Sequence, residues 1–272
     1  MSASIVPELQ TLRIEIDGEI GTLTLDRPEA FNAMSPEMIG ELAIAFAWLA
    51  DRAPIRALVV TGAGRAFCAG GDLNWFRRGL EEDEIDLPSE VRRGAEALHQ
   101  AIVDLRRSAY PVIAAVNGPA AGAGFSLALA CDLRIASEAA FFAPGYGRIG
   151  ASPDGGMTYF LPRVVGPARA LELLLEDPDL SAEEAKAEGI VAEVVAADEL
   201  AERARAKAEQ LAALPPHYVR MSKLLVAGSI EHTITEHLQL ERHGIADSMA
   251  TENARIGVTA FFAGEKPVFV GR

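Results

Sequence analysis

The first part of the chain alternates apolar and polar side chains in two short runs. These runs are residues 12–17 and 20–25, and Asp17-Gly18 stands where the first one ends. Alternation is the period of a strand with one buried face, and Asp-Gly between two such runs favours a tight hairpin turn. We therefore predict two antiparallel strands that are joined by a hairpin.

A helix is predicted shortly after this hairpin. Ser35-Pro36-Glu37 combines an N-cap serine with a proline in the first turn, where the missing N–H removes no hydrogen bond. Apolar residues then recur every three or four positions, which is the spacing of one helical face. They are Met38, Leu42, Ala45, Phe46 and Leu49.

Short apolar runs and longer amphipathic patterns alternate through the middle of the chain. The runs predict buried strands at 57–61, 112–116 and 133–136, and the longer patterns predict helices at 90–107 and 125–130. Strands that alternate with helices are typical of the α/β class. The acidic run 81–86 is followed by Pro88 and predicts a solvated loop.

After Pro167 the pattern becomes predominantly helical. The predicted helices cover 168–176, 181–188, 198–214 and most of 216–263, and one short strand at 190–195 interrupts them. We expect an α/β core over residues 1–197 and a helical C-terminal region over residues 198–272, which together suit a chain of this length.

Charge and cysteine content narrow the function classes. The chain has 25 basic and 39 acidic residues, which give a formal charge of −14. Such a chain repels phosphate backbones and anionic membranes, so we expect neither nucleic acid nor a membrane as a partner. Cys68 and Cys131 lack metal-ligand spacing and predict two reduced, buried thiols. No targeting segment and no bilayer-spanning stretch is found, and we expect a cytoplasmic protein.

Two glycine-rich loops are the strongest candidates for chemistry. Residues 66–73 and residues 117–125 each follow a predicted strand, and glycines there let a ligand approach backbone N–H groups closely. The second loop opens a helix, whose N-terminal N–H groups and dipole favour an anion or a developing oxyanion. A tight structural turn is the alternative interpretation of the first loop.

Nucleotide-binding patterns fit the second loop poorly. Its glycines fall as G-x-x-x-G-x-G, the reverse of the dinucleotide fingerprint, and no Lys-Ser/Thr pair completes a phosphate loop. Two loops of this kind instead suggest two backbone donors on one oxygen. An oxygen that gains charge in the reaction, such as a thioester carbonyl that becomes an enolate, would be stabilised there.

Several ordered motifs resemble those of the crotonase (enoyl-CoA hydratase/isomerase) family. Residues 64–73 resemble its first oxyanion-loop signature, and residues 111–132 resemble its second. Residues 26–34 resemble its N-terminal segment that contacts coenzyme A. Further similar segments are 161–166, 183–185 with 189–191, and 260–271. The resemblance therefore spans nearly the whole chain.

The resemblance implies both a fold and a substrate class. It implies a crotonase-like spiral of β-β-α turns with a helical C-terminal region that builds homotrimers, often paired into homohexamers. It also implies an acyl-CoA thioester as the substrate partner. Coenzyme A is then part of the substrate, and no metal or separate cofactor is expected.

Site residues also follow from the resemblance. Gly71 and Ala123 are implied as the backbone donors to the thioester oxygen. Substrate contacts are implied at Ala33, Ala69, Gly70, Asp72, Leu73 and Gly122. Asp72 is also expected to anchor its loop by hydrogen bonds. Lys266, in the C-terminal tail, is a candidate for the coenzyme-A phosphates, and an ordinary surface lysine is the alternative.

The residue types at two positions argue against ordinary hydration. Family hydratases use two glutamates to place and deprotonate a water, and the matching positions here are Ser126 and Tyr146. Neither side chain is a useful base near neutral pH, because serine is barely acidic and the ordinary pKa of tyrosine is near 10. We expect Ser126 and Tyr146 to line the acyl pocket instead.

One carboxylate, Asp154, lies in the right stretch. Several family double-bond isomerases, and a family dehalogenase, carry a working aspartate at the matching position, and an isomerase needs only one base. The resemblance therefore favours an enoyl-CoA double-bond isomerase with Asp154 as general acid/base. For Asp154 itself, the alternatives are capping of a helix that begins at Gly155 and nucleophilic attack on an aryl-CoA. For the protein, they are an enoyl-CoA hydratase and a binding protein without turnover. A serine hydrolase that uses Ser126 lacks the second glycine of a nucleophile elbow.

Overall fold

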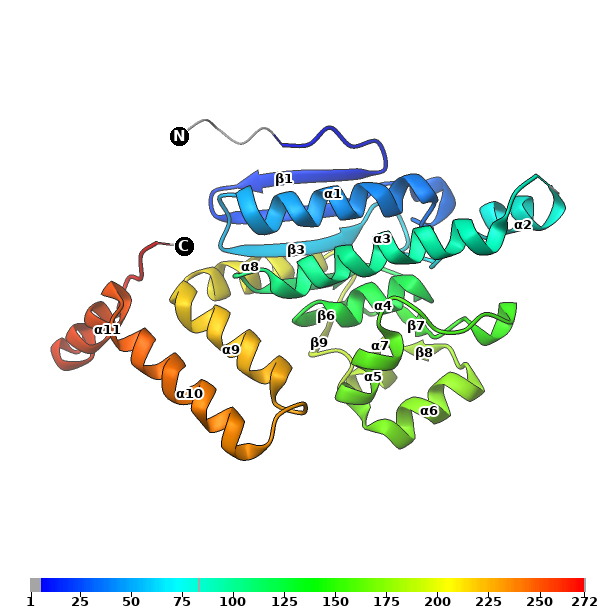
Figure 1. The fold of residues 1–272 in the computed structure, drawn as a ribbon. Coiled ribbons are helices and arrows are strands. Elements are labelled where there is room, and N and C mark those ends of the chain that lie inside the picture. The colour runs from blue at the N-terminus through cyan, green and yellow to red at the C-terminus, as the bar shows by residue number, and fades with distance from the viewer. Residues whose placement is uncertain (1–5, 83, 272) are drawn as a thin grey trace.

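The computed structural model describes residues 6–82 and 84–271, and within them the strands form two sheets (Figure 1). The larger sheet has the order β1 (Leu12–Asp17), β2 (Ile20–Leu25), β3 (Ala57–Gly62), β4 (Val112–Val116), β6 (Leu133–Ser137) and β9 (Glu193–Val195). β1 and β2 form the predicted antiparallel hairpin, and the other neighbours pair in parallel. The smaller sheet joins β5 (Ala120–Ala121), β7 (Phe141–Ala143) and β8 (Leu180–Ser181).

The chain passes between the two sheets in a repeating order. β4 is followed by β5 and β6 by β7, and after β3 the residue Cys68 pairs with Ala120 of β5. A helix comes after each of these short segments, because parallel neighbours need a crossover to return to the same edge. This order is the α/β spiral of β-β-α turns that the sequence predicts.

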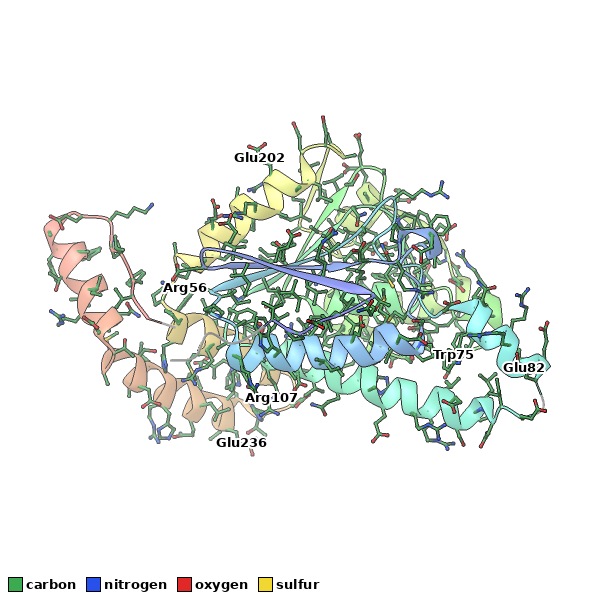
Figure 2. The ribbon with its side chains drawn as sticks, turned by 90° about the horizontal axis from the view of Figure 1, so that it is seen from above. Arg56, Trp75, Glu82, Arg107, Glu202 and Glu236 are labelled. Carbon is green, nitrogen blue, oxygen red and sulfur yellow. The ribbon has the colours of Figure 1, made fainter. Side chains whose placement is uncertain are left out.

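Helices cover both faces of the larger sheet, as Figure 2 shows from above. One face carries α1 (Pro36–Arg52), α3 (Leu87–Arg107) and α4 (Ala123–Ala130), and the other carries α8 (Leu200–Ala212). Successive side chains of a strand point to opposite faces. Leu58 and Val60 of β3 therefore enter the main core, whereas Ala57 and Val59 pack beneath α8.

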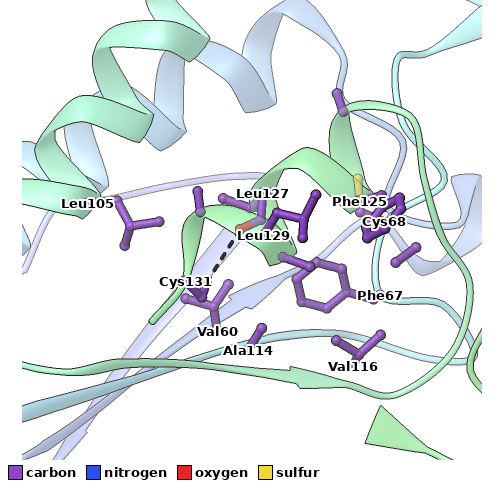
Figure 3. Close-up of a cluster of buried hydrophobic side chains, with 14 of the residues drawn as sticks. Val60, Phe67, Cys68, Leu105, Ala114, Val116, Phe125, Leu127, Leu129 and Cys131 are labelled. Carbon is purple, nitrogen blue, oxygen red and sulfur yellow. Dashed lines mark hydrogen bonds between the residues drawn. The ribbon is translucent and has the colours of Figure 1, made fainter. Parts of the chain in front are cut away.

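The main core joins α4 to the strands that carry the glycine-rich loops (Figure 3). Phe67 and Phe125 are fully buried, one from each loop region. Cys68 and Cys131 are buried and form no disulfide, and burial raises the pKa of each thiol to about 12. Both thiols are therefore protonated at neutral pH, in agreement with the prediction of buried, reduced cysteines.

The last three helices form an arm that extends away from the sheet in Figure 1. They are α9 (Pro216–Gly228), α10 (Ile234–Met249) and α11 (Glu252–Ala263). Arg56 ties both ends of the arm to the core, because its Nη2 donates to Leu214 O at 2.8 Å and its Nη1 to Phe269 O at 3.2 Å. α8 is buried on the sheet, so the arm begins at α9. The predicted division at residue 198 stays a prediction.

Two helices lie where none is predicted. α2 (Leu73–Glu81) has apolar residues at helical spacing, Leu73, Phe76 and Leu80, but it is only nine residues long and directly follows the first glycine-rich loop. α5 (Met157–Val165) follows two glycines and contains Pro162, and both features argue against a helix. The acidic run lies between α2 and α3, with residue 83 outside the described residues.

The other helices follow the predicted order with small shifts. α3 begins at Leu87, three residues before the predicted start, because Asp86 accepts from Ser89 N and caps it. α6 (Pro167–Glu176) and α7 (Ala182–Ala187) lie where helices are predicted. Ser181, the predicted first residue of the second of these, is its N-cap and part of β8.

Glycine at position 124 is required by close packing of the two loops. A Cβ there would overlap the carbonyl oxygen of Cys68 and lie 2.6 Å from its Cβ, whereas a Cβ on Gly40 of α1 would meet no atom within 4 Å. Gly124→Ala should therefore lower the free energy of unfolding by about 1–3 kcal/mol. Gly40→Ala should raise it by about 0.5–1 kcal/mol, because alanine favours a helix. Urea denaturation of both variants measures the difference, and two changes of the same sign would contradict this packing argument.

Candidate active site

The two glycine-rich loops meet side by side. Ala121 N donates to Cys68 O at 2.9 Å within the parallel pairing of Cys68 with Ala120. The contact is close enough that a Cβ on Gly122 would lie 3.7 Å from Gly70 Cα. Gly122 has φ +51° and ψ −125°, a conformation that is unfavourable for residues with a side chain. The structure thus brings Gly70, Gly71, Gly122 and Ala123 together.

The N–H groups of Gly71 and Ala123 are not used by the pairing that positions them. Met34 pairs in parallel with Gly71 through Gly70 O and Asp72 N, at 2.7 and 3.1 Å, so the N–H of Gly71 faces away from this pairing. Ala123 is the first residue of α4, where an N–H has no acceptor within the helix. Both N–H groups are therefore suited to bind an external oxygen.

An ion pair and a buried amide hold the first loop in place. Arg27 donates to Asp72 Oδ2 from Nη1 and Nη2, each at 3.1 Å, and to Ala33 O at 2.6 Å. Asn32, which is fully buried, donates to Ala63 O at 2.9 Å and to Ala66 O at 2.8 Å. Asp72 also caps α2 by accepting from Asn74 N at 3.0 Å. The predicted anchoring role of Asp72 is thus present, with Arg27 as an added partner.

Asp154, Tyr146 and Ser126 form one hydrogen-bonded group beside the second loop. The hydroxyl of Tyr146 donates to Asp154 Oδ1 at 2.8 Å and lies 3.1 Å from Ser126 Oγ. Ser126 Oγ donates to the backbone oxygen of Asp154 at 2.9 Å. Tyr146 also contacts the second loop, because a Cβ on Gly122 would lie 4.0 Å from its Cζ. Three predicted site residues that are distant in sequence therefore meet at Gly122.

Burial defines the chemistry of this group. Burial, and then the negative charge of Asp154, raises the pKa of Tyr146 well above its ordinary value. Tyr146 is thus a neutral donor at every physiological pH. Ser126 is fully buried. Helix capping by Asp154 is excluded, because α5 begins at Met157 and the Asp154 side chain makes no capping hydrogen bond to it.

A cavity of about 830 Å³ borders the backbone after Asp154. Its walls come from α3, α5 and α9, and Gly155 and Gly156 form part of its lining. Most of the other lining side chains are apolar, among them Ile102, Phe160 and Val226. Gly155 N donates to His99 Nε2 at 3.3 Å, and both residues line the cavity.

Three other residues are predicted to contact the substrate: Ala33, Ala69 and Leu73. Ala33 is buried and bound to Arg27, and Ala69 N donates to Phe31 O at 3.0 Å. Leu73 is 55 % exposed at the start of α2. All three belong to the two segments that pair through Met34 and Gly71.

Lys266 lies apart from the other predicted residues in a single chain. It lines a second cavity of about 550 Å³ with Asp17, Arg56 and Arg205. Asp17 is at the hairpin end of the sheet, and the first glycine-rich loop leaves β3 at the opposite end. The two ends are separated by roughly 17–20 Å, the length of a six-residue strand. The proposed contact with coenzyme A stays a prediction.

Comparisons with known proteins all indicate the same family. The model of the enoyl-CoA hydratase/isomerase family matches residues 15–272. The chain belongs to the enoyl-CoA hydratase/isomerase (crotonase) family. It is 38 % identical over 257 residues to 1,2-epoxyphenylacetyl-CoA isomerase of Escherichia coli K12. The aligned region covers 94 % of this chain and 97 % of that protein.

Two further relatives carry hydratase names. A Rhodobacter capsulatus protein named probable enoyl-CoA hydratase is 39 % identical over 262 residues, covering 96 % of this chain and 98 % of that protein. The crystal structure of an enoyl-CoA hydratase from Polaromonas sp. JS666 has a TM-score of 0.89 at 35 % identity and covers 95 % of this chain and 99 % of that one. Family membership therefore establishes the crotonase fold and an acyl-CoA enzyme, and the names divide over the reaction.

Some residues of the site are not evident from the pattern alone. Arg27 and Asn32 lie in the segment that resembles the family's coenzyme-A contact region, and here they bind the first glycine-rich loop. His99 lies on a helix face with no motif around it, and only the fold brings it to Gly155.

Within the described residues, no helix has the length and apolar character needed to cross a bilayer.

The pair between Arg27 and Asp72 should contribute more than an ordinary surface pair. Its side chains are 21 % and 12 % exposed, whereas Arg13, which pairs with Glu15 and Asp26, is 52 % exposed. Arg27→Gln should lower the free energy of unfolding by about 2 kcal/mol, because a charged hydrogen-bonding partner is lost. Arg13→Gln should lower it by less than about 1 kcal/mol. Equal losses in urea denaturation would mean that Arg27 does not hold the loop.

Proposed function

We propose that this chain is an enoyl-CoA double-bond isomerase in which Asp154 is the single general acid/base. The observation that carries the proposal is the position of the Asp154 carboxylate. Tyr146 binds it at 2.8 Å and also packs against Gly122, the residue before the donor Ala123. The site thus combines one carboxylate with two N–H groups that are free to bind an oxygen. Ser126 and Tyr146 provide no second carboxylate. This arrangement matches a reaction that needs one base.

The reaction moves one proton and one pair of electrons along the acyl chain. Asp154 removes a proton from the α carbon of a 3-enoyl-CoA, and the electrons of that C–H bond form the enolate. The negative charge that develops on the thioester oxygen is stabilised by the N–H groups of Gly71 and Ala123, and each such donor is worth about 2.7–4 kcal/mol in the transition state. Protonated Asp154 then returns the proton to the γ carbon. The product is the 2-enoyl-CoA, and no other reactant is needed.

The cavity beside Gly155 offers space for the acyl group. Its volume of about 830 Å³ and its mostly apolar walls suit a hydrocarbon or aromatic portion of a substrate. The name of the Escherichia coli relative also joins isomerisation to an aromatic acyl group. Both observations are compatible with an apolar acyl chain that extends past Asp154.

Hydration is the second candidate, because the Rhodobacter capsulatus relative and the Polaromonas structure carry hydratase names. It requires a base that activates water together with an acid that protonates the α carbon. Tyr146 is an unsuitable base, because burial and the charge of Asp154 raise its pKa. A binding protein without turnover is the third candidate and would bind acyl-CoA unchanged.

Replacement of Asp154 separates these candidates. Asp154→Asn keeps the size of the side chain but removes the base, so conversion of a 3-enoyl-CoA to the 2-enoyl-CoA should fall by about 10²–10⁴-fold in kcat. KM should change little, because the coenzyme-A contacts remain. Chromatography of the products from 3-enoyl-CoA and 2-enoyl-CoA measures both reactions in the same assay.

The control for this assay is Asp179→Asn, which changes an exposed carboxylate that pairs with Arg148 on the surface. It should leave kcat at the wild-type value. Rapid formation of 3-hydroxyacyl-CoA by wild type and by Asp154→Asn would overturn the isomerase proposal in favour of hydration. Binding of acyl-CoA by wild type without any product would favour the non-catalytic candidate.

We further propose that the C-terminal arm assembles copies of this chain into a trimer or hexamer. Its helices expose many large apolar side chains, which is unusual for a surface that faces water. They include Leu224, Val226, Ile230, Ile234, Leu238, Ile245, Met249, Val258, Phe261 and Phe262. Association through this surface would also provide a second chain near Lys266 and the open cavity beside α9.

The most exposed aromatic pair of the arm tests this assembly. Phe261 and Phe262 are 80 % and 84 % exposed. Replacing both by Glu should dissociate the assembly, because burying two new charges in an apolar interface is unfavourable. Ile44→Glu, on the exposed face of α1, should leave the assembly intact. Sedimentation velocity gives the mass of each species, and a monomeric wild type would contradict the proposal.

A further inference from the structure

Two hydroxyl groups hold Asp154 at two separate atoms. Each hydroxyl carries one proton, and the shortest contacts assign the proton of Tyr146 to Asp154 Oδ1 at 2.8 Å and that of Ser126 to the backbone oxygen of Asp154 at 2.9 Å. The longer contacts, from Tyr146 Oη to Asp154 O at 3.2 Å and to Ser126 Oγ at 3.1 Å, complete the group. The side chain and the backbone of Asp154 are therefore fixed independently.

The two carboxylate oxygens of Asp154 are consequently different. Oδ1 accepts the proton of Tyr146, whereas Oδ2 has no hydrogen bond with any of the residues that the structure describes. A hydrogen bond that is donated to one oxygen fixes the rotation of the whole carboxylate, because both oxygens lie in one plane. Tyr146 also contacts Gly122, so the same ring relates the carboxylate to the loop that carries Ala123.

We propose that Tyr146 is a positioning residue that directs Asp154 Oδ2 toward the substrate held by Gly71 and Ala123, with Ser126 fixing the backbone of Asp154. This inference rests on the proposed isomerase function. It changes the predicted role of Tyr146 and Ser126, which sequence reasoning placed in the lining of the acyl pocket. A residue that only lined the pocket would need no hydrogen bond to the base.

The test is Tyr146→Phe, which removes one oxygen and keeps the ring. We expect kcat for the 3-enoyl-CoA to fall by about 10–100-fold, because a misdirected base reacts slowly, with KM within about threefold of wild type. A fall in kcat at nearly constant KM is expected when the base is misdirected in the bound complex, because the contacts that bind the substrate remain. A variant that had only loosened the packing of the pocket would raise KM as well.

Ser126→Ala is the second variant, because its hydroxyl binds the backbone oxygen of Asp154 rather than the carboxylate. It should lower kcat by less than Tyr146→Phe does, because the hydrogen bond from Tyr146 to the carboxylate remains, and it should leave KM near the wild-type value. Tyr110→Phe is the matched control, since Tyr110 is another buried tyrosine, placed just before β4 and away from Asp154. It should leave both kcat and KM unchanged.

The outcomes distinguish this inference from the function on which it rests. A wild-type kcat in Tyr146→Phe, together with an inactive Asp154→Asn, would overturn the positioning role and leave the isomerase proposal standing. Full activity in Asp154→Asn would overturn both. A circular dichroism melt of each variant confirms that it is folded. If Tyr146→Phe does not fold, a wild-type kcat in Ser126→Ala overturns the proposal.

Discussion

The parallel pairing of Cys68 with Ala120 is the contact on which the site depends. It places the loop after β3 against the loop after β4, and Gly124 allows α4 to begin directly against the Cys68 backbone. Only a glycine backbone permits this approach, because any Cβ would overlap the neighbouring carbonyl. The geometry of the two N–H groups, at Gly71 and Ala123, is therefore a consequence of backbone packing more than of side-chain chemistry.

Buried aromatic side chains and polar contacts hold the two paired loops in place. Phe67 and Phe125 anchor the two loops in the main core, where both are fully buried. Arg27 and Asn32 bind the first loop from the outside by ion pair and amide hydrogen bonds. A donor that is fixed before the substrate arrives needs no reorganisation during the reaction, which is the condition for effective stabilisation of an enolate.

The group around Asp154 differs from this frame because it depends on side chains. Ser126 and Tyr146 stand at the positions where family hydratases carry glutamates, and here both bind Asp154. Two neutral hydroxyls around one carboxylate therefore replace the pair of glutamates. Under the proposed function, Asp154 is the single group that transfers the proton, and the residues around it select the reaction.

The sequence alone determined the hairpin, the strands of the larger sheet, most of the helices and the family, because these follow from local periodicity and from ordered motifs. It also singled out Gly71, Ala123 and Asp154 as candidate site residues. The helices α2 and α5 and the strands β5, β7 and β8 were not predicted, since these elements are short and α5 contains a proline. Only the tertiary structure decided that Tyr146 and Ser126 bind Asp154, that Arg27 holds Asp72 and that Lys266 lies at the far end of the sheet. The physical reason is that these contacts join residues from separate turns of the spiral, whose mutual distance is set by packing and not by sequence spacing.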